Sequence, residues 1–174
     1  MSNRTLFLTH ARRIHNALRH AIESGDGRTD DIWVHQERPV FEHYTCGMYL
    51  INCLAYLEGR YGEKWSDQKN NDSLDFDGFI ENDLPIHQKR RAENYEINKA
   101  GLEALICIRN ALVHNANDLR ENNDKNSEEK VTNAQIKGVE INNGIVTLIS
   151  NREDDFMEYV RLAFIFVSNF NGDS

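Results

Sequence analysis

Residues 94–115 read NYEINKAGLEALICIRNALVHN. Between residues 102 and 113 this stretch is apolar nearly all the way round a helix, which is typical of the most buried helix of a helical bundle. In the second half of that run, Arg109 and Asn110 interrupt the apolar residues and His114 follows them. A guanidinium and an imidazole in so apolar a helix need either hydrogen-bonding partners or a functional reason. The stretch therefore predicts both a helical core and the place to look for chemistry.

Helical periodicity extends to both sides of this segment. Apolar residues recur at intervals of three and four, which places them on one face of each predicted helix. Pro39 suits the first turn of one such helix, and Pro85 follows a shorter one. The predicted helices cover residues 4–23, about 39–62, about 74–80, about 94–115 and about 153–170.

A change of period marks a β-hairpin before the last helix. Around Asn143-Gly144 the apolar residues alternate, and this dipeptide is the strongest short signal for a two-residue hairpin turn because both residues accept a positive φ. Such a turn places the four alternating apolar side chains of the two strands, which belong to Val139, Ile141, Val146 and Leu148, on one face. It pairs Ile141 with Val146 and Val139 with Leu148. We therefore expect a single domain over residues 1–174, an all-α bundle of four to five helices with one small hairpin over about residues 135–149.

The segment from residue 117 to 130 is rich in asparagine and charge and has almost no apolar side chains. Such a composition favours a solvated connection over packed structure. We expect a flexible loop here, directly after the apolar helix.

Length and charge limit the classes of function. The chain has 174 residues, 20 lysines and arginines against 28 acids, and a net charge of −8. A domain of this size buries roughly 70% of its unfolded surface without disulfides or metals. The negative charge argues against polyanion binding over the whole surface. With neither a signal peptide nor an apolar run long enough to span a membrane, we expect a soluble, cytoplasmic protein.

Neither a cofactor nor a metal site is predicted. Cys46, Cys53 and Cys107 are an odd number of cysteines without Cys-x-x-Cys spacing, so we interpret them as small buried hydrophobic residues. The seven histidines show no metal-ligand spacing with cysteine or carboxylates, and there is no glycine-rich phosphate loop.

The motif Arg109-Asn110-x-x-x-His114 resembles that of the HEPN domains, which are short helical bundles. Their mark is an arginine, usually followed by a polar residue, and then a histidine after four to six positions. Other arginine–histidine pairs of this chain lie on polar faces or in loops. The resemblance implies a HEPN-like domain and a metal-independent endoribonuclease, a toxin or defence effector, whose partners are RNA and a protein antitoxin or regulator. This chain has Ala116 where the branch paired with nucleotidyltransferases often has tyrosine, which points to a stand-alone or differently partnered protein.

The residue types suit cleavage of RNA by its own 2′-hydroxyl, which leaves a 2′,3′-cyclic phosphate. A histidine titrates near neutral pH, so His114 would be the general base or acid. An arginine fork matches phosphate oxygens, so Arg109 would hold the phosphate and stabilise the transition state. Asn110 would orient one of these groups by hydrogen bonding.

Helical geometry bears on how Arg109 and His114 could cooperate. Five residues at about 100° each place them roughly 140° apart around a continuous helix. Both can contact one substrate if the helix ends near His114 or if a second copy of the motif lies across a two-fold axis. Since HEPN motifs usually meet at a dimer interface, the resemblance implies a homodimer.

Four other residues are candidates for binding substrate. Arg12, His15 and Arg19 share a face of the first predicted helix, and the first 22 residues of the chain carry +4 while the other 152 carry −12. They could contact RNA phosphates or form an ordinary solvated face. His43, near the start of the second helix, could join the cleft.

Two readings compete with the nuclease. A non-catalytic HEPN module would bind nucleotide, RNA or a protein partner through the same residues. In a structural interaction protein, Arg109 would cap carbonyls or pair with an acid, and His114 would be a boundary residue with satisfied hydrogen bonds. Different environments for Arg109 and His114 would favour the non-catalytic module.

Overall fold

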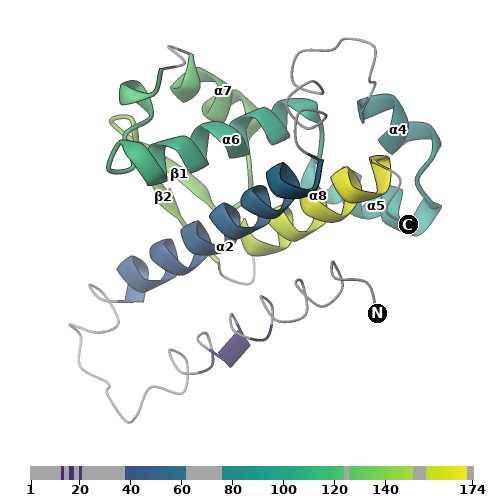
Figure 1. The fold of residues 1–174 in the computed structure, drawn as a ribbon, viewed down its shortest axis with the longest axis horizontal. Helices are drawn as coiled ribbons and strands as arrows, with labels where there is room; N and C mark the ends of the chain where they lie inside the picture. The colour runs from purple at the N-terminus through teal and green to yellow at the C-terminus, as the bar shows by residue number, and fades with distance from the viewer. Residues whose placement is uncertain are drawn as a thin grey trace.

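The computed structural model describes residues 13, 16, 17, 20, 38–61, 76–123, 126–150 and 156–171. Within these residues the chain is mostly helical, with one two-stranded antiparallel hairpin before the last helix (Figure 1). The elements are α2 (Arg38–Tyr61), α4 (Phe76–Asn82), α5 (Ile86–Tyr95), α6 (Lys99–His114), η2 (Leu119–Glu121), α7 (Ser127–Ala134), β1 (Val139–Asn142), β2 (Ile145–Leu148) and α8 (Phe156–Phe170). The predicted helical bundle with one hairpin is confirmed, although six α-helices are described where four to five were expected.

Helix α2 packs against both α8 and α6, and these contacts form the core (Figure 1). Helices α4 and α5 lie towards one end of the bundle, while the hairpin and α7 lie towards the other. Among the described helices, none is long and apolar enough to cross a membrane.

The sequence had indicated that α6 is the most buried helix, but among the described helices α8 buries the larger share of its residues. Ten of the 15 residues of α8 are buried, including Phe156, Tyr159 and Phe164, against six of the 16 in α6. The apolar residues Leu102 and Ile106 of α6 are only partly buried. A helix with apolar residues on every side is therefore not always packed against other elements on every side.

Helix α5 lies in a stretch that the sequence analysis left without structure. It buries only Ala92 and has no apolar stripe, which explains why periodicity missed it. It ends at Tyr95, and the residue that follows, Glu96, has a left-handed φ of 54°. Asn98 then caps α6 by accepting a hydrogen bond from the Gly101 amide at 2.8 Å. Helix α6 thus begins at Lys99, not near residue 94 as predicted.

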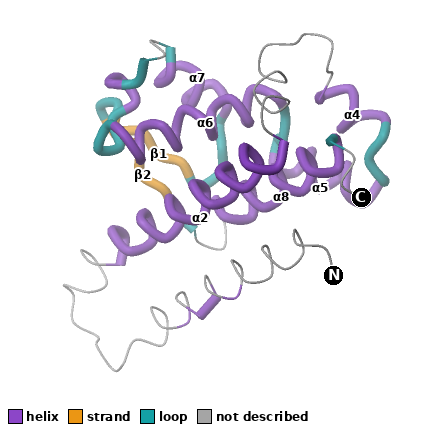
Figure 2. The backbone as a smooth tube through the Cα atoms, viewed as in Figure 1, coloured by secondary structure: helices purple, strands orange, loops and turns teal. Residues whose placement is uncertain are grey.

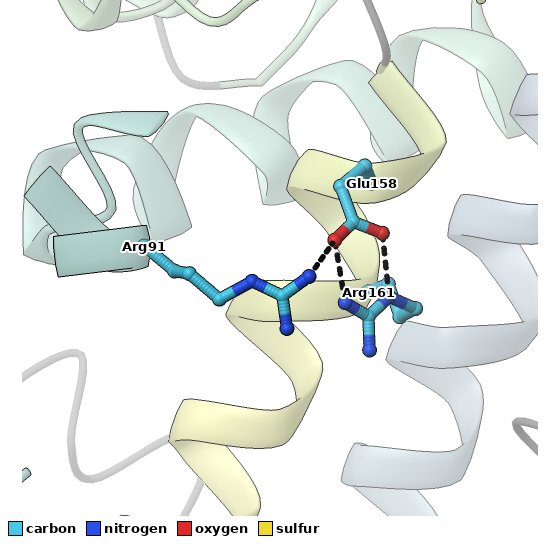
Figure 3. A network of polar contacts seen from close by, with 3 residues as sticks. All are labelled: Arg91, Glu158 and Arg161. Carbon is cyan, nitrogen blue, oxygen red and sulfur yellow. Dashed lines mark hydrogen bonds and ion pairs between the residues drawn. The ribbon is translucent and has the colours of Figure 1, made fainter. Parts of the chain in front are cut away.

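An ion-pair network joins the polar helix α5 to α8 (Figure 3). Glu158 of α8 accepts hydrogen bonds from Arg161 Nε at 2.6 Å and from Arg91 Nη2 of α5 at 3.4 Å. The bond to Glu158 is the main cause that raises the pKa of Arg161. Since Arg91 is 56% exposed, its pair with Glu158 contributes less than about 1 kcal/mol.

The hairpin has the predicted register. Val139 pairs with Leu148 and Ile141 with Val146, and the orange strands of Figure 2 mark this sheet. Asn143 and Gly144 form the turn with φ values of 50° and 77°. The four paired apolar side chains face the core, as expected.

The segment 117–130 contains more structure than the predicted loop. Leu119 is buried in η2, and Asp118 caps this turn by accepting from the Arg120 amide at 2.9 Å. Ser127, also buried, begins α7. The composition did not indicate these elements because each buries few residues, Leu119 in η2 and Ser127 and Val131 in α7. Mobility of the segment remains a prediction.

Candidate active site

Arg109 lies on α6 where this helix faces α2. Its Nη2 donates a hydrogen bond to Oε1 of Glu58 on α2, forming an ion pair. The side chain of Arg109 is 23% exposed and that of Glu58 is 42% exposed, so the pair lies at the edge of the helix interface. Arg109 Nε is buried and has no hydrogen-bond partner within the described part of the chain. The guanidinium is therefore held by a carboxylate but keeps one donor unused.

Glu58 was not among the residues singled out from the sequence. The only signal for it is an acid on the second helix, which is otherwise largely apolar, and nothing local indicates that it faces Arg109. The two residues are 51 positions apart, so their contact depends on how α2 and α6 pack.

His114 is the last residue of α6 and is exposed. The amides of Asn115 and Asn117 both donate to the carbonyl of Ala111 at 3.0 Å, which ends the helix. Ala116 and Asn117 then have positive φ values of 48° and 72°, so the chain turns sharply directly after the histidine. The helix thus ends at His114, one of the two arrangements that the sequence analysis required.

Hydrogen bonds fix the turn that follows His114. Asn115 Nδ2 donates to Asn122 Oδ1 at 2.5 Å, and Asn122 Nδ2 donates to the Cys107 carbonyl of α6 at 3.0 Å. The Asn117 carbonyl accepts from the Val146 amide of β2 at 2.9 Å. The end of α6 is therefore tied both to its own helix and to the hairpin.

Asn110 is partly buried and lies between Arg109 and His114 around the helix, about 100° from the arginine. Because α6 is continuous through this motif, Arg109 and His114 remain roughly 140° apart and about 7.5 Å apart along the helix axis. Arg109 contacts α2, whereas His114 is exposed at the helix end. Within one chain the structure gives the two residues different environments.

His43 is buried and packs against the hairpin. Its Nδ1 accepts a hydrogen bond from the Leu148 amide at 3.1 Å, which places the ring proton of the neutral form on Nε2. That Nε2 is buried and has no hydrogen-bond partner in the described chain. Burial lowers the pKa of His43, and the Asn117 side chain acts in the opposite direction. His43 therefore lies near the turn after His114 but contributes to packing, not to an exposed cleft.

The basic candidates Arg12, His15 and Arg19 lie outside the described residues. On the same predicted helix, Arg13 and His20 are described, and both are helical and exposed.

The cysteines are buried and free, as the sequence predicted. Burial is the main cause that raises the pKa of Cys53 to about 12, which keeps this thiol protonated at neutral pH. Among the described residues, no three histidine, cysteine or carboxylate side chains are grouped as a metal site.

Comparisons of the chain with protein-family models, with curated proteins and with solved structures find no match.

Proposed function

We propose that this protein is a metal-independent endoribonuclease of the HEPN type. It would cleave RNA by attack of the substrate's own 2′-hydroxyl, leaving a 2′,3′-cyclic phosphate, and would act as a toxin or defence effector. His114 would transfer the proton as general base or acid. Arg109 would hold the scissile phosphate, and Asn110 would orient one of these groups.

The exposure of His114 is the observation that carries this proposal. A proton-transfer group must be reachable by the substrate, and His114 is exposed at the end of α6 beside a turn fixed by hydrogen bonds. The fixed turn holds the backbone beside His114, so the imidazole extends from a defined position at the helix end.

Arg109 can serve as a phosphate clamp only in competition with Glu58. A phosphate in place of the carboxylate would keep the guanidinium paired through the Nη2 edge that now binds Glu58. Because the pair is partly exposed, an incoming anion can approach it without unfolding the helix interface.

A homodimer is part of this proposal. In one chain Arg109 and His114 face different environments, so the two groups on one phosphate would come from two copies of the motif related by a two-fold axis. RNA would be the substrate, and a protein antitoxin or regulator would restrain the activity in a cytoplasmic setting.

The different environments of Arg109, which pairs with Glu58, and of His114, which is exposed, favour a second candidate, a HEPN module without catalysis. In that case the pair fastens α2 to α6, and the exposed His114 belongs to a surface that binds nucleotide, RNA or a protein partner.

Incubation of RNA with the protein in excess EDTA tests the proposal. The wild-type chain should cleave and His114→Ala should not, while His87→Ala, a change of another exposed histidine on α5, should cleave normally. Intact RNA after incubation with folded wild-type protein would refute the nuclease and favour the non-catalytic module.

A further inference from the structure

Helix α2 carries a stripe of large apolar side chains that are exposed. Val40, Tyr44 and Met48 are 53%, 64% and 57% exposed, and their spacing of four residues places them along one side of the helix. We call these three residues the α2 stripe. Three neighbouring apolar side chains in water are a costly arrangement for a small domain and mark a surface that another element covers.

The α2 stripe is not a poorly formed part of the core. The adjacent side of the same turns is packed, because His43 bonds to β2 and an added Cβ at Gly47 would lie 3.3 Å from Leu112 of α6. This half of α2 therefore uses one side for the core and presents another apolar side outward.

The chain before α2 supplies an element of matching character. In residues 4–23, Phe7, Ala11, Ile14 and Leu18 recur at helical spacing and form an apolar stripe. The described residues of this segment, Arg13, Asn16, Ala17 and His20, are helical and exposed. At about 100° per residue these four lie on the side of the helix away from the apolar stripe. The face known to be exposed is thus the polar one.

The length of the connection permits a return to α2. Residues 24–37 can span up to roughly 45 Å when extended, whereas a helix of 20 residues is about 30 Å long. The connection reaches α2 at Arg38, two residues before the α2 stripe begins, and Gly25 and Gly27 favour a change of direction.

We propose that residues 4–23 dock their apolar stripe onto the α2 stripe of the same chain. The docked segment would carry its arginines on its outer surface, so a basic strip would lie beside α2 on an otherwise acidic protein. This inference does not depend on the nuclease proposal.

Oxidation of Met48 by hydrogen peroxide, followed by peptide mass spectrometry, tests this docking. In the wild-type chain Met48 should oxidise at least tenfold more slowly than in a variant with Ile14→Asp and Leu18→Asp, because the acids prevent burial of the stripe. The matched control Ala17→Asp changes the exposed face and should leave Met48 protected. Buried Met157 reports in every sample whether the core is folded.

Three results would overturn the proposal. One is oxidation of wild-type Met48 at the rate of free methionine, which needs no variant to interpret. Another is equal protection in the Ile14→Asp, Leu18→Asp variant and the wild type. The third is protection that disappears on dilution, which would assign the α2 stripe to a second copy of the chain.

Discussion

Replacing Glu58 by glutamine should strengthen RNA binding at little cost in stability. The change removes the carboxylate that pairs with Arg109 but keeps the length and shape of the side chain. Since the two side chains are 23% and 42% exposed, water screens the pair, and its loss should lower the free energy of unfolding by less than about 1 kcal/mol. In the variant an incoming phosphate no longer has to displace the Glu58 carboxylate from Arg109. The same free energy, less than about 1 kcal/mol, therefore corresponds to an affinity gain of up to about fivefold.

Fluorescence anisotropy with an uncleavable 2′-deoxy-substituted oligonucleotide measures this gain at fixed salt, and urea denaturation measures stability. Glu42→Gln is the matched control, because Glu42 is another acid of α2 that pairs with an arginine, Arg38, and the change alters net charge equally. A loss of affinity in Glu58→Gln, or a gain no larger than in Glu42→Gln, would refute the competition between Glu58 and phosphate at Arg109.

Further predictions follow from burial and backbone geometry. His114→Ala should abolish cleavage and leave the melting temperature nearly unchanged, because His114 is exposed; a large drop in melting temperature would indicate a structural role instead. The lowered pKa of His43 means that its contribution to stability is complete above about pH 6.5 and is lost as the pH falls from there towards the folded-state pKa. His43→Asn keeps an acceptor for the Leu148 amide but removes the titrating imidazole. The free energy of unfolding from urea denaturation should therefore depend less on pH between 7.5 and 5 than in the wild type. Gly138→Ala should cost more than about 2 kcal/mol, because φ is 77° and the added Cβ would lie 2.3 Å from the Ile149 carbonyl oxygen. Gly59→Ala meets nothing within 4 Å on α2 and should stabilise by about 0.5 kcal/mol; equal effects of the two glycine changes would contradict this reasoning.

Local signals in the sequence predicted the elements whose causes are local. The Asn143-Gly144 turn and the alternation around it specify the hairpin register without help from the rest of the chain. The end of α6 at His114 was one of the two arrangements that the spacing of the motif had left open. Helix α5 escaped prediction because its residues show no apolar stripe and only Ala92 is buried.

The candidate site was predictable only in part, since its surroundings come from distant parts of the chain. Arg109 and His114 stood out as polar residues of an apolar helix. Their environments depend on Glu58, which α2 brings to Arg109, and on the hairpin, which holds the turn after His114. His43 was grouped with the site as a histidine near the start of the second helix, but packing against Leu148 buries it.

Cleavage of an RNA with a single 2′-deoxy nucleotide at the scissile position tests the central claim most directly. We expect the wild-type protein in EDTA to cleave the all-ribose substrate at this position to a 2′,3′-cyclic phosphate. It should leave the substituted substrate intact there, because the attacking group is missing. Cleavage of the substituted substrate at an undiminished rate would contradict the mechanism that assigns His114 and Arg109 their roles.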